Sequence, residues 1–263
     1  MVTFIDTHAH LGSEDYQDDC DEVIERSLSN GVWMINVGTD KESSELTVEL
    51  ASRRKEGVFA AVALHPENAV REKFDPEFYR RLIKENKKIV AIGETGLDYG
   101  RDEKSGVRDD QKQLQKETFK KHIELAIEVE KPLIIHCRKA HDDILDILSF
   151  YFSLSSFVSR GVAHSFLGNY KQARRYRELG FKIAFNGIIT YARDYDKVIL
   201  DTPLHDILIE TDCPYLTPAP YRGERNEPKY VIEVAKKLAE VKKLSYEEVV
   251  EQTTKNAREL FRI

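Results

Sequence analysis

Histidines and carboxylates that could hold metal ions stand at regular places in the sequence, each at the end of a short apolar run. His8 and His10 stand two positions apart, so an extended chain would point both imidazoles the same way, toward one ion. The later members of this set are His65, Glu94, His136, His164 and Asp212. So many ionisable groups can share one partly dry site only if cations balance and order them.

This ligand set would offer nitrogen and oxygen atoms only. Imidazole together with carboxylate suits Zn, Mn, Co, Ni or Fe, and carboxylate-dominated sites also accept Mg. Two ions about 3.5–4 Å apart would activate a water molecule and stabilise a leaving oxygen. The residue types therefore indicate a divalent-metal centre that can carry out hydrolysis.

Eight short, β-branched apolar runs alternate with longer amphipathic segments, as expected for parallel strands buried on both faces. The expected strands are residues 3–7, 33–37, 58–64, 89–93, 132–136, 161–164, 182–185 and 207–209. The expected helices are residues 18–30, 41–56, 76–86, 111–130, 141–151, 170–180, 193–199, 229–241 and 245–262. Ser245 and Glu248 fit a capping box that opens the last helix.

Eight strand–helix units predict an α/β fold, a (β/α)8 TIM barrel formed by a single domain over residues 1–263. The alternative is an open doubly wound sheet, which usually has fewer strands and a glycine-rich first turn. Here the first turn reads HAHLGS, which favours the barrel. Functional groups of a TIM barrel gather at the carboxyl ends of its strands, where the histidines and carboxylates stand.

The composition is typical of a globular enzyme, with 41% hydrophobic and 33% charged residues among 263. Because the net charge is −6, an anionic substrate would have to be attracted by a local patch or by metal ions. No apolar run approaches the roughly 20 residues that span a bilayer, and a strand directly after Met1 leaves no secretory signal. The three cysteines favour a reduced, cytoplasmic protein.

Motifs along the whole chain resemble those of the TatD family of metal-dependent hydrolases, within the amidohydrolase-like barrel superfamily. The clearest are DTHAHL at 6–11, IGETGLDY at 92–99, KPLIIHCRKA at 131–140, HSF at 164–166 and IETDCPYLTP at 209–218. The resemblance implies a two-metal centre. In it, His8, His10 and Asp212 would hold one ion, His136 and His164 would hold the other, and Glu94 would bridge both.

The resemblance also implies a nuclease that uses Mg or Mn and removes nucleotides from the 3′ end of DNA or RNA, without a membrane or an obligate protein partner. Water activated by the two metals would attack phosphorus, with Glu94 and Asp212 as catalytic groups and Asp212 taking the proton. The leaving oxygen would be protonated by water or by His65. One alternative keeps the site but cleaves a carboxylic ester or amide, as a D-aminoacyl-tRNA deacylase or a lactonase would. A non-catalytic nucleic-acid adaptor is a third reading, disfavoured by the net charge and the intact ligand set.

Candidate substrate contacts lie beside the predicted ligands. Arg222 and Arg225 stand in RGERNEP, after the last strand, and arginine can bind phosphate with two hydrogen bonds. Such a charged loop is more often simply solvated. Arg138, two residues after His136, and His65 are further candidates for contact with phosphate or leaving group.

Other residues near the predicted ligands are expected to have structural roles. Alternation along an extended chain would turn Cys137 and Cys213 away from the ligand face, so both are predicted to be packing residues. Asp6 is predicted to orient an imidazole or the segment around it. His122, in the middle of a predicted helix, is expected to lie away from the site.

Overall fold

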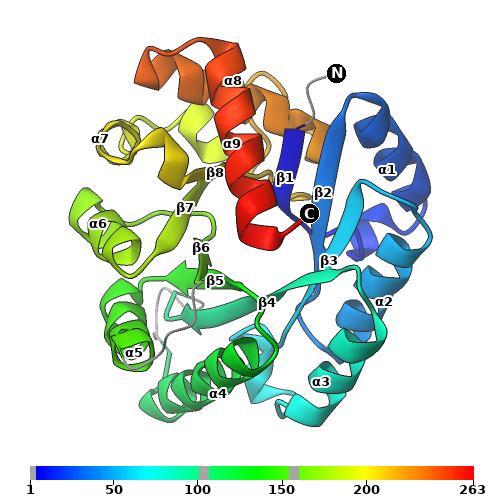
Figure 1. Cartoon of the computed structure of the whole chain (residues 1–263), viewed down its shortest axis with the longest axis vertical. Helices are drawn as coiled ribbons and strands as arrows, with labels where there is room; N and C mark the ends of the chain where they lie inside the picture. Colours follow the sequence, from blue (N-terminus) through cyan, green and yellow to red (C-terminus); the bar gives the residue numbers. More distant parts are fainter. Residues whose placement is uncertain (1–3, 101–106, 154–159) are drawn as a thin grey trace.

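The computed structural model describes residues 4–100, 107–153 and 160–263, and its eight strands form one parallel sheet in chain order (Figure 1). The strands are β1 Phe4–Ala9, β2 Val32–Val37, β3 Val58–Val62, β4 Ile89–Asp98, β5 Leu133–Arg138, β6 Gly161–Ala163, β7 Phe181–Phe185 and β8 Ile207–Ile209. Helices alternate with them and surround the sheet, so the predicted (β/α)8 TIM barrel is confirmed.

The α-helices are α1 Cys20–Ser29, α2 Lys41–Ser52, α3 Pro76–Glu85, α4 Asp109–Glu128, α5 His141–Ser153, α6 Tyr170–Glu178, α7 Asp196–Asp201, α8 Val231–Lys242 and α9 Tyr246–Phe261. The 3-10 helices are η1 Glu14–Tyr16, η2 Asn68–Val70, η3 Gly187–Thr190, η4 Leu204–Asp206 and η5 Pro228–Tyr230. The predicted capping box of Ser245 and Glu248 opens α9. Among the described residues, no helix is long and apolar enough to cross a membrane.

The interior of the barrel is filled by one apolar side chain or more from every strand, including Ile5, Ile35, Ile134 and Leu208. The last turns of α9 pack Leu260 and neighbouring apolar residues against this cluster. In Figure 1, α9 accordingly lies across the centre of the barrel. A second, larger apolar layer fills the space between the strands and the outer helices. The strands are therefore held from both sides, which keeps their ends in place.

The fourth strand differs from its predicted extent, because β4 continues past Gly93 to Asp98. Its second half pairs with β5, where Gly96 stands opposite His136. A Cβ atom on Gly96 would lie 2.0 Å from the His136 carbonyl oxygen, so only glycine allows the two strands to approach there. Glu94 consequently lies inside a paired strand instead of at its end. The third strand is shorter than predicted, and Thr3 of the first predicted strand lies outside the described residues.

The barrel closes between its first and last strands through a short seam. The backbone N–H of His10 donates to the carbonyl of Cys213 at 2.8 Å, and that of Asp212 donates to the carbonyl of His8 at 2.9 Å. Below these bonds, the buried carboxylate of Asp6 accepts hydrogen bonds from the Thr211 N–H and hydroxyl. Asp6 also accepts the N–H of His8 at 3.2 Å, as expected of a group that orients this segment. The closing of the barrel thus brings residues 8, 10 and 212 together.

The buried His122 side chain fixes the segment that leads to His65. Its Nδ1–H donates to the carbonyl of Thr118 at 2.9 Å, and its Nε2 accepts the N–H of Leu64 at 3.0 Å. The centre of the Phe74 ring lies 3.9 Å from the centre of the His122 ring. His122 therefore does not line the cavity described below, as expected, but it anchors the chain one residue before His65. Burial lowers the pKa of His122 to about 3, which keeps the ring neutral.

The buried, neutral His122 makes the protein less stable in acid. Between about pH 6.5 and pH 3 an unfolded chain protonates this ring and the folded chain does not, so the free energy of unfolding falls as the pH falls. Replacing His122→Gln should reduce the slope of that free energy against pH by up to about 1.4 kcal/mol per pH unit in this window. Urea unfolding at pH 7, 6 and 5 measures it. His205→Gln, at a side chain that is 68% exposed, is the control, and equal slopes in all three proteins would contradict the account.

Candidate active site

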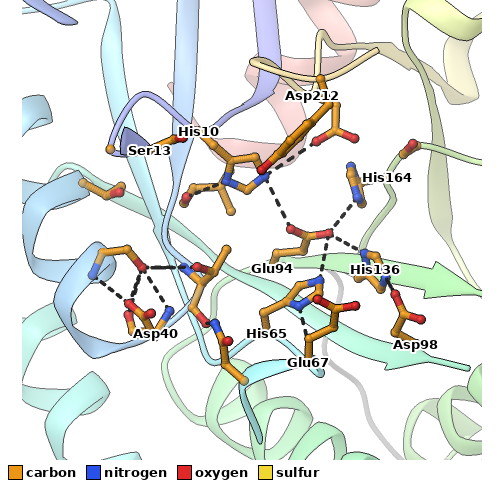
Figure 2. A pocket seen from close by; sticks show the side chains of 18 of the residues that line it. His10, Ser13, Asp40, His65, Glu67, Glu94, Asp98, His136, His164 and Asp212 are labelled. Carbon is orange, nitrogen blue, oxygen red and sulfur yellow. Dashed lines mark hydrogen bonds and ion pairs between the residues drawn. The ribbon is translucent and has the colours of Figure 1, made fainter. Parts of the chain in front are cut away.

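The carboxyl ends of the strands open into a cavity of about 880 Å³, and the predicted metal ligands meet in it (Figure 2). Its lining includes His10, His65, Glu94, His136, His164 and Asp212. His8 lies fully buried just behind this wall. The structure therefore brings all six predicted ligands into one place, from β1, β4 and β5 and from the segments that follow β1, β6 and β8.

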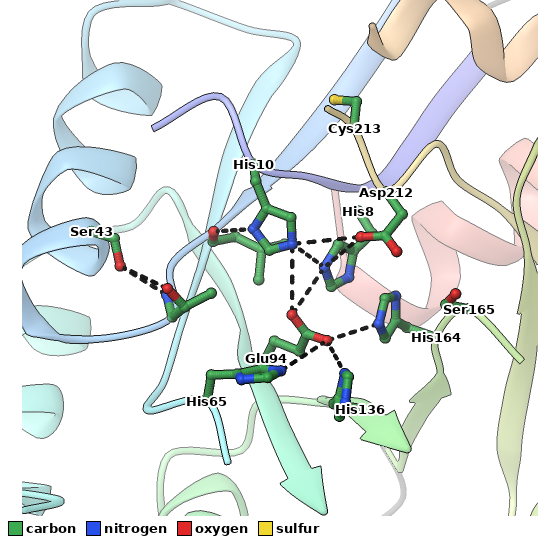
Figure 3. A network of polar contacts seen from close by, with 12 residues as sticks. His8, His10, Ser43, His65, Glu94, His136, His164, Ser165, Asp212 and Cys213 are labelled. Atoms are coloured by element: carbon green, nitrogen blue, oxygen red, sulfur yellow. Dashed lines mark hydrogen bonds and ion pairs between the residues drawn. The ribbon is translucent and has the colours of Figure 1, made fainter. Parts of the chain in front are cut away.

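The two oxygen atoms of the Glu94 carboxylate face different pairs of histidines (Figure 3). Oε2 lies 3.4 Å from His8 Nε2 and 3.6 Å from His10 Nε2. Oε1 lies 2.6 Å from His136 Nδ1 and 2.8 Å from His164 Nε2. One carboxylate thus faces two pairs of nitrogen donors, one pair at each oxygen.

The first set is completed by Asp212. Its Oδ1 lies 3.9 Å from His8 Nε2 and 3.6 Å from His10 Nε2, and these two nitrogens are 3.0 Å apart. The Nδ1–H of His10 donates to the carbonyl of Val37, which leaves a lone pair on Nε2. Two imidazole nitrogens at this distance need a shared proton or a cation between them. Their geometry and their nitrogen and oxygen chemistry fit a divalent metal.

The second set lies beside two carboxylates that sequence reasoning did not single out, Asp98 and Glu210. His136 places Nε2 2.9 Å from Asp98 Oδ2, so Nε2–H can donate there while the Nδ1 lone pair faces Glu94. His164 places Nδ1 3.3 Å from the buried Glu210 Oε1. Asp98 is in the GLDY segment and Glu210 directly precedes the TD pair of Asp212. Their position in the same motifs as the ligands was the available signal.

The conformation of Asp98 is itself fixed. The N–H of Gly100 donates to its Oδ1 at 2.8 Å, and the side-chain amide of Gln115 bonds both the N–H and the carbonyl of Asp98. This leaves Oδ2 directed at His136. Because ligating histidines commonly donate their second N–H to a carboxylate, Asp98 is placed to select the tautomer of His136.

Three overlapping groups in the described part of the chain place potential ligand atoms within 4.8 Å of one another: His8 with His164 and Glu210, His8 with His10 and Glu94, and His65 with Glu94 and His136. Buried histidine nitrogens and carboxylate oxygens at this density repel or compete for protons unless cations bind. The cluster is therefore a candidate metal-binding site.

The electrostatics of the protein groups alone favour positive charge beside Glu94. Burial raises the pKa of Glu94, but the surrounding imidazoles lower it by more than burial raises it. The net pKa is well below its usual range. Burial lowers the pKa of His136, whereas Glu94 and Asp98 raise it, to about 9. Glu94 is consequently ionised, and the positive charge that it attracts is a proton on His136 or a cation. Metal binding would displace that proton.

Several non-glycine residues with left-handed backbone conformations gather around the site. Ser165 has φ 43°, Asp212 58° and Leu216 57°, and all three line the 880 Å³ cavity. Such conformations cost free energy and persist where the surrounding structure enforces them. At Asp212 the turn follows directly on the seam hydrogen bond to His8, so barrel closure and side-chain placement are linked.

The predicted substrate contacts have different surroundings. His65 and Arg138 line the cavity. Arg225 donates two hydrogen bonds to Asp19, at 2.8 and 2.6 Å, and Arg222 lies over a tyrosine ring, 4.1 Å from its centre. Neither of these two arginines lines the cavity, so for them substrate contact stays a prediction.

The two cysteines beside the ligands also differ. Cys213 is fully buried, as predicted for a packing residue. Cys137 packs against the apolar layer, as predicted, and also forms part of the cavity wall, where burial raises the pKa of its thiol to about 12 and keeps it neutral. A neutral thiol is a poor metal ligand.

The sequence profile of a family described as TatD related DNase matches residues 5–262. An uncharacterized metal-dependent hydrolase of Bacillus subtilis is 39% identical over 261 residues, which cover 98% of each chain. A second uncharacterized metal-dependent hydrolase, from Escherichia coli, is 36% identical over 265 residues, which cover 98% of this chain and 96% of that protein. The crystal structure of a TatD homologue from Escherichia coli matches over the whole of both chains, with a TM-score of 0.88 and 29% identity.

Asp98 should govern metal affinity without touching the metal. The substitution Asp98→Ala removes the carboxylate that orients His136, so affinity for Mn²⁺ should fall about 10–100-fold. Calorimetric titration of the chelator-treated protein measures this loss. Glu42→Ala is the matched control, since Glu42 is an exposed carboxylate of the same cavity. Equal Mn²⁺ affinity in the Asp98→Ala and Glu42→Ala proteins would refute the orienting role.

Proposed function

Because the chain belongs to the TatD family of metal-dependent hydrolases, we propose that it is a nuclease with two divalent ions that removes nucleotides from the 3′ end of DNA or RNA. His8, His10 and Asp212 would hold one ion and His136 and His164 the other, as a bridged pair. When bound, such ions lower the pKa of water and offset the charge that develops on phosphoryl oxygens.

The proposal of two ions rests on the position of the Glu94 carboxylate, whose two oxygens face different histidines. Oε2 faces the His8 and His10 nitrogens, and Oε1 faces those of His136 and His164. A single ion would need these donors on one side of the carboxylate. Two sets on its two oxygens suit a pair of ions, and paired ions are common in phosphodiester cleavage, where they stabilise the attacking and the leaving oxygen.

Asp212 is the residue that would accept the proton of the attacking water. Burial raises its pKa, but the hydrogen bond with His10 and the nearby imidazoles of His164 and His8 hold it below the usual value. Asp212 is therefore ionised before substrate binds. Its position at the barrel seam, hydrogen-bonded through its N–H to the carbonyl of His8, holds the carboxylate in the wall of the cavity.

His65 would bind the substrate as a hydrogen-bond donor. Its Nδ1 accepts the N–H of Glu67 at 3.2 Å, which leaves the proton on Nε2. That Nε2 lies 3.7 Å from Glu94 Oε1 and lines the cavity. The neutral ring can donate to a phosphoryl or leaving oxygen, and a solvent water then supplies the proton that the departing 3′ oxygen takes.

The cavity has room and surfaces for a nucleotide. Its volume of about 880 Å³ falls within the range of pockets for small ligands. Tyr215 lines this cavity and is 59% exposed, so its ring offers a face for a base. Arg138 lines the same cavity and can bind a phosphate oxygen.

Removing the charge of Glu94 should abolish turnover. In Glu94→Gln one carboxylate oxygen becomes an amide nitrogen that cannot ligate, so Mn²⁺-dependent release of nucleotides from an oligonucleotide should fall at least about a hundredfold. Glu14→Gln, which changes an exposed carboxylate of the same cavity, is the matched control and should retain activity. Circular dichroism checks that both variants fold. Turnover in Glu94→Gln equal to that of the control would refute the proposed centre.

The type of bond and the direction of cleavage have a separate test. With Mg²⁺ or Mn²⁺, a 5′-labelled linear oligonucleotide should shorten one nucleotide at a time, and a circular single strand of the same sequence should stay intact. EDTA should stop the reaction. Cleavage of the circle would show internal cutting and contradict the 3′-end proposal. An intact linear strand together with hydrolysis of a D-aminoacyl-tRNA would assign the site to carboxylic esters instead.

A further inference from the structure

A second cavity of about 640 Å³ adjoins the metal-binding cavity. Cys137, Arg138 and Leu167 line both, so they form the wall that the two share. The second cavity is built from the segments that follow β5, β6 and β7, at the same end of the barrel as the site. A chain molecule bound at the metals can therefore continue into it over Arg138 and Leu167.

The two cavities differ in charge. The described outer lining of the metal-binding cavity is acidic, with Glu14, Asp40, Glu42 and Glu67, and Arg138 is its one lysine or arginine among the described residues. Beyond Arg138, the second cavity adds Lys139 and Lys197, with Asp194 as its one described carboxylate. A polyanion whose scissile phosphate lies at the metals would be repelled on the acidic side. The basic cavity offers it a favourable path.

The second cavity also carries aromatic and apolar surfaces beside these cations. Tyr170 and Tyr195 line it, and the ammonium of Lys197 lies 4.1 Å from the centre of the Tyr170 ring. Leu167, on the shared wall, is 45% exposed although it is a large apolar residue. Cations that follow a backbone, interleaved with rings on which bases stack, are the usual features of single-strand binding surfaces.

The backbone turns sharply at Lys139, where the chain enters the second cavity. Lys139 has φ 56°, a left-handed conformation that ends β5 and turns the chain into α5. The side chains of both Arg138 and Lys139 are exposed, and Arg138 lines both cavities whereas Lys139 lines the second. Among the described residues, neither Lys139 nor Lys197 forms an ion pair with a carboxylate, and Lys197 contacts the Tyr170 ring.

We propose that the second cavity, lined by Lys139, Tyr170, Tyr195 and Lys197, is the binding groove for the nucleotides that flank the bond cleaved at the metal centre. The ligand class is a single-stranded nucleic acid longer than a dinucleotide. This proposal rests on the proposed nuclease function for the identity of the polymer. It adds that affinity and preference for length come from this groove, outside the metal-binding cavity.

The test compares a 12-nucleotide oligothymidylate with the dinucleotide TpT, whose single phosphodiester occupies only the metal-binding cavity. In the wild type, kcat/KM should be at least about tenfold higher for the 12-mer. The double variant Lys139→Glu/Lys197→Glu should lower the ratio of the two values about tenfold. Anisotropy of a fluorescein-labelled 12-mer in EDTA measures binding without cleavage. The slope of log affinity against log salt should fall by about 0.7 for each lost phosphate contact.

Lys255→Glu in α9 provides the control for charge reversal, because Lys255 is 63% exposed and lines neither cavity. It should change neither the ratio nor the binding. The groove is refuted if the double variant binds and cleaves the 12-mer as the Lys255→Glu protein does, or if the wild type cleaves both substrates equally well. If the wild type cleaves neither substrate but the double variant still binds the 12-mer more weakly, the groove stands and the proposed nuclease function falls.

Discussion

The site depends on the position of one buried carboxylate, that of Glu94. Its two oxygens face histidine nitrogens of two separate sets, at 2.6–3.6 Å. It can do so because β4 continues as a paired strand beyond Glu94 and because Gly96 allows β5 to approach with His136. A carboxylate on a loop would not hold this arrangement against the repulsion among its neighbours, whereas a strand packed from both sides does.

Barrel closure supplies the rest of the site. The hydrogen bonds that join the chain after β8 to β1 connect His10 with Cys213 and Asp212 with His8. The last ligand is therefore placed by the same contacts that complete the fold. Asp6 holds both sides of the seam with one carboxylate. Any change that opens the seam would separate Asp212 from the two histidines of its set.

The strand count, the barrel and the meeting of the predicted ligands follow from local patterns, since parallel buried strands and the alternation within HAH can be recognised in the sequence. The contacts that cannot be read in this way join residues far apart in the chain. Asp98 orients His136, and Arg225 pairs with Asp19, because of the register between strands and loops. The hydrogen bond from the Leu64 N–H to His122 could not be predicted either, since it depends on how α4 packs against the segment that follows β3.

The central claim is that Glu94 serves two ions at once. Diffraction from crystals of the Mn²⁺-loaded protein, with anomalous data collected near the manganese absorption edge, tests it most directly. The account predicts two anomalous peaks, one beside His8, His10 and Asp212 and one beside His136 and His164, with one Glu94 oxygen on each. A single peak, or two peaks of which one lies away from Glu94, would contradict it.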